Sequence, residues 1–272
     1  MTEATRREPG SPCWVSLMVH GLDATREFYG ELFGWEFAPG PPRLGPYARA
    51  LLDGREVAGI GLLPADRGLP GSWTVYLASD DADGTAESVR CAGGTVAVGP
   101  LDAGAAGRLV ICSDPSGAVF GVWQAAAFAG TSAAGGPGTP VWYELLTYEA
   151  EPAVKFYRTL FGYEPEPDAS DGPDHVVLTA AGRPALSVRG LGRDLPRDRG
   201  AHWTTWFEVA DPDAAARRAA ELGGRVLDTP RDGAGGRRAT LADPEAASGR
   251  GEIAELIAAF NSMLDRLEAE RA

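Results

Sequence analysis

One pattern of residues occurs twice in this chain of 272 residues. In the first copy, an apolar strand pattern that includes Trp14 leads into a helix pattern that contains Phe28. In the second copy, Trp142 and Phe156 repeat this arrangement, and both pairs are 128 positions apart (142 − 14 and 156 − 28). Later landmarks keep nearly the same offset: Trp73 with Trp203, Gly93-Gly94 with Gly223-Gly224, and Asp114-Pro115 with Asp243-Pro244. A repeat of this length comprises a whole domain, so we predict two tandem modules.

Hydrophobic periodicity predicts the elements of each module. In module 1, a strand over residues 13–19 precedes a helix that ends at Gly34, and two further strands flank a tight hairpin at Asp53-Gly54. A second strand and helix follow, and further strands close the module. This order predicts an α+β fold in which each module contains two successive βαβββ units. Module 1 spans residues 12–124, a linker rich in Gly, Ala and Pro spans 125–140, and module 2 spans 141–248.

The end of module 2 departs from the repeat. No final strand is visible after Asp243-Pro244, and residues 250–272 have apolar side chains at the a and d spacing of a helix-packing seam: Ile253, Leu256, Phe260, Met263 and Leu267. We therefore expect a C-terminal amphipathic helix in place of the last strand, which leaves an open sheet edge along residues 237–241. Such a helix would pack on the module or join two copies into a homodimer.

Composition excludes several classes of partner. The formal net charge is −13, which argues against binding to nucleic acid or to an anionic membrane, because both require clustered Lys and Arg. No apolar run approaches the roughly 18 residues of a spanning helix, and the N-terminus lacks the apolar segment of a signal peptide. We expect a cytoplasmic protein. The three cysteines, Cys13, Cys91 and Cys112, have no metal-binding spacing, so we interpret them as reduced, structural residues.

The Phe-Tyr-x-x-Leu-Phe-Gly helix and the Asp-Pro-x-Gly turn at Asp114 resemble those of the vicinal oxygen chelate superfamily, which includes glyoxalase I, bleomycin-resistance proteins and extradiol dioxygenases. The resemblance covers residues 12–124 fully and 140–244 in part. It implies paired βαβββ units whose sheets curve around a cleft, with helices outside. The tail helix, in turn, resembles the second helix of a HAMP linker.

The resemblance also implies where a divalent metal would bind in metal-dependent members. A His or Gln lies on the first strand, a His on the strand before the second helix, and a Glu on the last strand. Here these positions contain Trp14 and Trp142, Thr74 and Thr204, and Gly121. A functional site of this kind needs at least three ligands. We therefore predict no metal and no other cofactor, with a divalent metal as the alternative.

The alternation of strand residues predicts which side chains face the cleft. In module 1 these are Trp14, Ser16, Met18, Tyr76 and Trp123, and in module 2 they are Trp142, Glu144, Trp206 and Glu208. Two interpretations stay open: the rings form a pocket for a flat or hydrophobic small molecule, or they simply fill the cleft. Each carboxylate needs a partner on such a face, which could be Arg49 or water at the cleft mouth.

The function predicted from these residues is binding of a small hydrophobic or aromatic molecule, without metal, as in a sequestering or resistance-type protein. The first alternative is an enzyme of the same superfamily, a lyase, isomerase or dioxygenase, for which no catalytic residue is assigned. The second is an interaction protein that acts through its C-terminal helix. Fold alone does not choose among them, because function belongs to the site.

Overall fold

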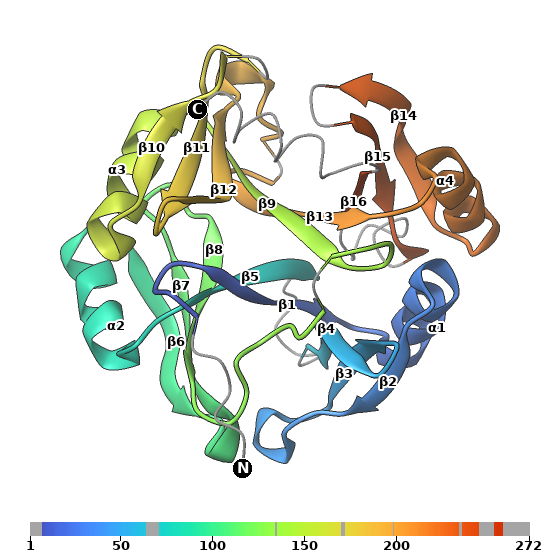
Figure 1. The fold of residues 1–272 in the computed structure, drawn as a ribbon, viewed down its shortest axis with the longest axis horizontal. Coiled ribbons are helices and arrows are strands. Elements are labelled where there is room, and N and C mark those ends of the chain that lie inside the picture. Colours follow the sequence, from blue (N-terminus) through green and yellow to red (C-terminus); the bar gives the residue numbers. More distant parts are fainter. Residues whose placement is uncertain are drawn as a thin grey trace. The chain divides into compact units, whose positions relative to one another are not determined.

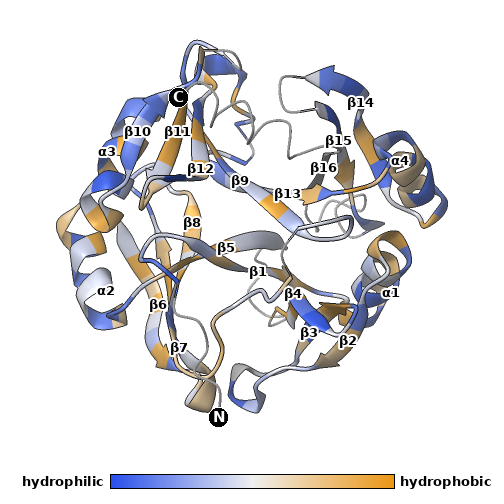
Figure 2. Cartoon of the chain, in the orientation of Figure 1, coloured by the Kyte–Doolittle hydropathy of each residue, from blue (hydrophilic) through white to orange (hydrophobic). Residues whose placement is uncertain are grey.

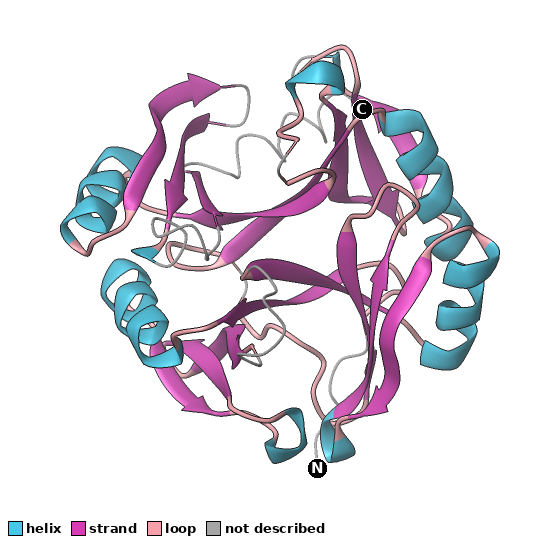
Figure 3. Ribbon diagram, turned by 180° about the vertical axis from the view of Figure 1, so that it is seen from behind, coloured by secondary structure: helices cyan, strands magenta, loops and turns pink. Residues whose placement is uncertain are grey.

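The computed structural model describes residues 7–63, 71–133, 135–169, 172–197, 199–233, 236–244 and 253–257. These residues form an α+β fold in which one motif, βαβββ, occurs four times (Figures 1 and 3). This confirms the predicted fold class and the two motifs per module. Among the described residues, no helix is both long enough and apolar enough to span a membrane.

Module 1 consists of the first two motifs. The first contains β1 (Pro12–Val19), α1 (Leu22–Phe33), β2 (Glu36–Pro39), β3 (Tyr47–Leu52) and β4 (Arg55–Leu62), with a 3-10 turn, η1 (Pro42–Leu44), before β3. The second contains β5 (Ser72–Ala78), α2 (Ala82–Cys91), β6 (Thr95–Asp102), β7 (Gly107–Ser113) and β8 (Val119–Ala125), with η2 (Gly104–Ala106) before β7.

Module 2 repeats this order. Its first motif contains β9 (Pro140–Thr147), α3 (Ala150–Phe161), β10 (Glu164–Pro167), β11 (His175–Ala180) and β12 (Arg183–Gly190), followed by η4 (Gly192–Asp194). Its second contains β13 (His202–Glu208), α4 (Pro212–Glu221), β14 (Arg225–Gly233), β15 (Gly236–Ala242) and β16 (Ile253–Ile257). In every motif the first strand is parallel to the fourth, and the other pairs are antiparallel.

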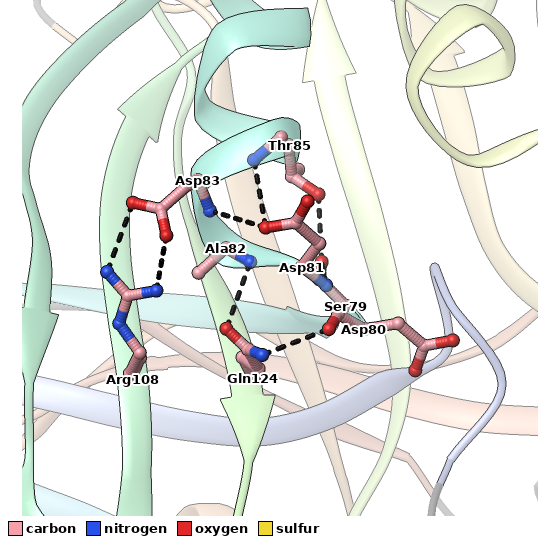
Figure 4. A network of polar contacts seen from close by, with 9 residues as sticks. Ser79, Asp80, Asp81, Ala82, Asp83, Thr85, Arg108 and Gln124 are labelled. Atoms are coloured by element: carbon pink, nitrogen blue, oxygen red, sulfur yellow. Dashed lines mark hydrogen bonds and ion pairs between the residues drawn. The ribbon is translucent and has the colours of Figure 1, made fainter.

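Glycine and aspartate set the ends of several elements, as the sequence predicts. Gly34 ends α1 with a φ of 74°, and the β3–β4 hairpin turns through Asp53 and Gly54 with φ values of 50° and 73°. At the start of α2, the Asp81 carboxylate accepts the N–H groups of residues 83 and 84. The side-chain amide of Gln124 on β8 accepts the N–H of residue 82 and donates to the carbonyl of residue 80. Beside it, Arg108 pairs with Asp83 (Figure 4).

Contacts divide the chain into two compact units, and each unit takes one motif from each module. The first comprises Met1–Trp14, Thr74–Gly130 and Tyr143–Thr204; the second comprises Val15–Trp73, Thr131–Trp142 and Thr205–Ala272. In the first unit α2 packs against α3, and in the second α1 packs against α4 (Figure 1). In Figure 2, hydrophobic residues follow strands such as β8 and β11.

The recurring Tyr and Asp-Pro motifs are structural. In the first unit the buried Tyr157 hydroxyl of α3 donates to Asp114 over 3.2 Å and accepts from Trp203 Nε1 at 3.2 Å. In the second unit Tyr29 of α1 likewise donates to Asp243 over 3.5 Å. The helix of one module therefore hydrogen-bonds the turn of the other, which explains these residues without a catalytic role.

The expected replacement of the last strand by a helix is wrong for residues 253–257. They form β16, which is parallel to β13 and antiparallel to β15, with Arg238 opposite Ile257. Module 2 is therefore not one strand short, and residues 237–241 are not an open edge. The backbone groups of β13 and β15 need partners, and satisfying them outweighs a helix propensity of a few tenths of a kcal/mol per residue. The remaining seam residues and the HAMP-like segment, 258–272, lie outside the described residues.

The linker is tied to the units at several points despite its composition. Trp123 Nε1 donates to the Phe128 carbonyl at 2.8 Å in the first unit. In the second, the Thr131 hydroxyl donates to the Glu56 carbonyl at 2.9 Å, and Trp35 Nε1 donates to the carbonyl of residue 138 at 2.7 Å. These bonds anchor the described residues of the linker, which brings Phe128 against predicted site residues.

The cysteines follow the sequence interpretation in two of three cases. Cys13 and Cys112 are buried, and burial raises the pKa of Cys13 to about 12 and that of Cys112 to about 11. Their thiols therefore stay protonated at neutral pH. Cys91, the last residue of α2, is exposed and does not have the buried structural role interpreted from the sequence.

Candidate functional site

Four ionisable residues from the first motif of module 2 meet inside the first unit. We call them the charged cluster: Glu144, Asp168, His175 and Arg189. Glu144 lies on β9 opposite Ser187 of β12, and His175 begins β11 opposite Arg189. Asp168 follows β10, and its backbone N–H donates to the His175 carbonyl over 3.0 Å. Strand register therefore brings these side chains together from three strands and the end of a fourth.

Contacts within the charged cluster are short, and the cluster is shielded from solvent. Arg189 donates to Glu144 Oε1 from Nε at 2.9 Å and from Nη2 at 2.7 Å. The imidazole of His175 lies between two carboxylates, with Nε2 3.4 Å from Glu144 Oε1 and Nδ1 3.4 Å from Asp168 Oδ2. Glu144 is 5% exposed, His175 7% and Asp168 8%. Arg189 therefore compensates the charge of Glu144, whereas both ring nitrogens of His175 are buried and have no hydrogen-bond partner among the described residues.

The protonation of Glu144 follows from two opposing effects. Burial raises the pKa of its carboxyl group, but the facing His175 and Arg189 lower it by more, so the pKa lies below its ordinary value of 4.5. Glu144 is therefore an ionised carboxylate at neutral pH. It can accept hydrogen bonds, and it does not act as an acid there.

The partners of the two predicted carboxylates differ from the expectation. Arg49 is not the partner of Glu144, because it forms an ion pair of 2.9 Å with Glu56, seven residues along the β3–β4 hairpin. Glu208 accepts the N–H of Gly136 at 3.0 Å. The carboxylate of β9 thus has a partly buried cationic partner, Arg189, whereas that of β13 accepts a hydrogen bond from the linker backbone.

Module 1 has neutral residues where module 2 has the charged cluster. Ser16 occupies the position of Glu144, and its hydroxyl lies 2.6 Å from that of Tyr47, which occupies the position of His175. Three glycines stand where module 2 has Asp168, Ser187 and Arg189: Gly40, Gly59 and Gly61. A Cβ atom at any of the three would overlap or crowd the Tyr47 side chain. The glycines therefore make room for the tyrosine ring.

Trp14 and Trp123 are brought together by a ring that the sequence did not indicate. Phe128 of the linker packs edge-on against Trp14, with centroids 4.9 Å apart, and against Trp123, with centroids 5.9 Å apart. Both indoles are buried. For these two residues the interpretation that the rings fill the cleft fits the geometry, because Phe128 packs edge-on against both indoles.

Other predicted site residues lie against neighbouring glycines or charges. The Tyr76 ring lies over Gly121, where a Cβ atom would overlap it, and the Met18 sulfur lies 2.8 Å from the place of a Cβ at Gly61. In the second unit the Arg238 guanidinium stands 5.8 Å from the centre of the Trp206 ring. Trp142 is buried on β9.

The residues present do not fit the superfamily's metal centre. Strand register pairs Tyr76 with Gly121 in module 1 and Trp206 with Glu255 in module 2, so Glu255 occupies the last-strand ligand position of module 2. The sequence pattern missed it because the final strand was not recognised. The other positions hold tryptophan and threonine, which leaves one carboxylate where three ligands are needed. Within the described part of the chain, no three His, Cys, Asp or Glu residues are grouped to hold a metal.

The charged cluster could have been found from the repeat. At the offset of 128, Ser16 becomes Glu144, Tyr47 becomes His175 (175 − 47), and residue 61 becomes Arg189 (189 − 61). Each change introduces an ionisable group at a strand position whose counterpart is uncharged. Of the four cluster residues, the alternation of side chains along the strands identified only Glu144. Alternation predicts which face of its own strand a residue occupies, but it does not predict which residues of other strands lie beside it.

Sequence comparisons match both modules to one superfamily. Residues 13–122 match the Glyoxalase/Bleomycin resistance protein/Dioxygenase superfamily, and residues 144–248 match the Glyoxalase-like domain. The anthracycline biosynthesis protein DauV of Streptomyces sp. strain C5 is 37% identical over 260 residues, 89% of this chain and 93% of that protein. The putative glyoxylase CFP32 of Mycobacterium tuberculosis is 36% identical over 253 residues, 91% of this chain and 96% of that protein.

Solved structures share the fold at low sequence identity. The Mn(II)-bound glyoxalase of Novosphingobium aromaticivorans has a TM-score of 0.65 and 20% identity, over 93% of this chain and 83% of that one. The halotolerant catechol dioxygenase BphC has a TM-score of 0.60 and 15% identity, over 92% of this chain and 87% of that one. At such identities the similarity shows the architecture, and the site must be argued from its own residues.

Proposed function

Because the chain belongs to the glyoxalase/bleomycin resistance protein/dioxygenase superfamily, we propose that it binds a small aromatic or hydrophobic molecule and does so without a divalent metal ion. One observation carries the proposal: the superfamily's metal-ligand positions are occupied by Trp14, Thr74 and Gly121 in module 1, and by Trp142, Thr204 and Glu255 in module 2. Indole rings and a glycine offer a metal no ligand, and a single glutamate is fewer than the three ligands that such a site needs, whereas an indole provides a large surface for a planar molecule.

Module 2 supports an aromatic ligand with a polar group. Trp142 and Glu144 both lie on β9 and, two residues apart, share one face of the strand. Binding sites for small molecules commonly combine apolar rings with a few polar groups that set orientation. The name of DauV places that relative in anthracycline biosynthesis, and anthracyclines are planar fused-ring compounds, so the relative's name agrees with such a ligand class.

The test combines metal analysis with ligand binding. Purified protein should contain far less than one equivalent of zinc, iron, manganese or nickel by mass spectrometry. Binding of 2-naphthol and 2-methoxynaphthalene, two planar probes, should be saturable by calorimetry, and either at 100 times its dissociation constant should stabilise the protein by about 2.7 kcal/mol. The variant Trp142→Ala should bind both probes more weakly.

A matched control is Tyr148→Ala, which removes an aromatic side chain that is 48% exposed just beyond β9. This variant should bind the probes as the natural protein does. Stoichiometric metal whose removal destabilises the protein would contradict the metal-free part of the proposal. Absence of saturable binding to a broad set of planar compounds would show that the rings only fill space.

A second candidate function is catalysis without a metal, which the charged cluster favours. Buried ionisable groups with perturbed pKa values concentrate at catalytic sites, and CFP32 is named as a putative glyoxylase. Lyase or isomerase chemistry remains compatible with a carboxylate and an imidazole 3.4 Å apart. Turnover of a substrate that is lost in Glu144→Gln would favour this candidate over binding alone.

A further inference from the structure

The first unit contains a cavity that the proposed aromatic site does not use. It lies between the end of α2, the turn at residues 114–116 and α3 (Figure 1), and its volume is about 410 Å³. Sites for small molecules commonly have volumes of about 300–1,000 Å³. The buried residues Ala153 and Phe156 line this cavity, and so do the exposed residues Glu149 and Lys155. The cavity therefore combines an apolar wall with one accessible group of each charge.

The two exposed charges of the cavity have no ion-pair partner among the described residues. Lys155 on α3 is the only lysine of the chain, and its counterpart in the first copy of the repeat is Glu27 (155 − 128). Glu149 precedes α3, and its side chain does not cap the helix. The third charged residue of the lining, Asp114, differs from these two, because its carboxylate already accepts two hydroxyl groups and two backbone N–H groups. A ligand would therefore meet one ammonium group and one carboxylate that are both available.

The second unit has an ion pair across the corresponding groove between its helices. There Arg218 of α4 reaches Glu31 of α1, with Nη2 2.6 Å from Oε2. The helices α2 and α4 are offset by 130 (211 − 81), so the corresponding residues of the first unit are Ser88 (218 − 130) and Thr159 (31 + 128). Each of these hydroxyls donates to a carbonyl of its own helix. Neither side chain bridges the two helices, and Thr159 lines the cavity instead.

We propose that this cavity binds a zwitterion with an apolar side chain, as in an aromatic amino acid or a short peptide. The ammonium group of the ligand pairs with Glu149, its carboxylate pairs with Lys155, and its apolar part packs against Phe156. A simple anion would leave Glu149 unpaired beside it, and a simple cation would leave Lys155 unpaired. A molecule that has both charges therefore complements the lining best.

The single lysine makes a direct test possible. Reductive methylation with a ¹³C label modifies only Lys155 and the N-terminal amino group, and it keeps the positive charge. NMR spectroscopy can then follow the Lys155 signal during titration with L-phenylalanine and with the dipeptide L-alanyl-L-phenylalanine. We expect a saturable shift of this signal, and the probe that binds more tightly identifies the source of the zwitterion as an amino acid or a peptide.

Probes that lack one charge separate the two ion pairs. N-acetylation removes the ammonium group of a probe, and amidation removes its carboxylate. Each change should weaken binding by about two- to fivefold, which is the contribution of a partly exposed ion pair. Backbone amide NMR shifts of the protein can measure these affinities for the natural protein and for its variants.

Two variants test the same pairs from the side of the protein. Lys155→Gln should weaken the zwitterionic probes by about two- to fivefold and leave the affinity of the amidated probes unchanged, because they have no carboxylate. Glu149→Gln should do the same with the N-acetylated probes as the unchanged set. The matched controls Arg158→Gln and Glu151→Gln, at exposed positions of α3 outside the cavity, should leave all affinities unchanged.

Three results would overturn the inference. The first is the absence of saturable binding of either zwitterion at millimolar concentration, and the second is equal affinity for the complete and the blocked probes. The third is a loss in Arg158→Gln as large as that in Lys155→Gln, which would show unspecific attraction to the helix. Trp142 and Glu144 do not line this cavity, so each of these results leaves the proposed function intact.

Discussion

The first motifs of the two modules have the same order of strands and helix, but they differ in the side chains at corresponding strand positions. Around β1, β3 and β4, the hydroxyls of Ser16 and Tyr47 form one neutral hydrogen bond of 2.6 Å, and glycines clear the space for the ring. Around β9, β11 and β12, the same strand positions hold Glu144, His175 and Arg189 in a buried ionic group. The comparison shows that two copies of one fold can hold a neutral, tightly packed group of side chains in one case and an ionic group in the other.

The largest expected effect separates the buried ion pair from an exposed one. Arg189→Met leaves Glu144 buried without its cation, and we expect the free energy of unfolding to fall by about 3–5 kcal/mol. In module 1, Arg49→Met removes a partly exposed pair with Glu56, which should cost about 1 kcal/mol or less. Denaturant unfolding of the two variants measures both values, and equal losses would contradict the assignment of a buried ionic group to module 2 alone.

Exchanging a single residue between the motifs tests the role of the glycines. Gly59→Ser introduces the residue that module 2 has at this position. The serine Cβ would overlap the Tyr47 hydroxyl, so we expect the free energy of unfolding to fall by about 1–3 kcal/mol from overpacking. The second change Tyr47→His, which completes the module 2 pair, should recover part of this loss. Thermal unfolding of the single and double variants decides the matter; if Gly59→Ser is neutral, the ring does not need the glycine.

The pH dependence of stability should differ between the two motifs. The folded-state pKa of Glu144 is lowered from 4.5, so its stabilisation is fully present above about pH 4.5 and is lost as the pH falls through the folded-state value. The stability difference between the natural protein and Glu144→Gln should therefore shrink below pH 4.5. The difference for Ser16→Ala should stay constant over the same range. Unfolding curves at several pH values measure both, and a constant Glu144→Gln difference would contradict the ionised state.

The smallest effect belongs to the neutral hydrogen bond of module 1. Tyr47→Phe keeps the ring and removes the partner of the Ser16 hydroxyl, which should lower the free energy of unfolding by about 0.5–1.5 kcal/mol. Probe binding should be unchanged, because we assign the polar part of the site to module 2. A large loss of 2-naphthol affinity in this variant would show that module 1 also takes part in recognition.

Several predictions from the sequence held because they depend on local chemistry. The hairpin at Asp53-Gly54 was recognisable because both residues adopt positive φ, which aspartate and glycine tolerate. The helix stop at Gly34 has the same basis. β16 was missed because residues 253–257 have a composition that favours a helix. They form a strand because they pair with the edges of β13 and β15.

By itself, the sequence determined the duplication and the order of strands and helices in the first three motifs, because repeats and periodicity can be read directly from the residues. The tertiary structure decided what each site residue contacts. Glu144 meets Arg189 rather than Arg49 because β9 and β12 are parallel neighbours, and Phe128 closes over Trp14 because the linker folds back. Such contacts join residues far apart in the sequence, and the physical reason is that strand register and burial, not local propensity, select them.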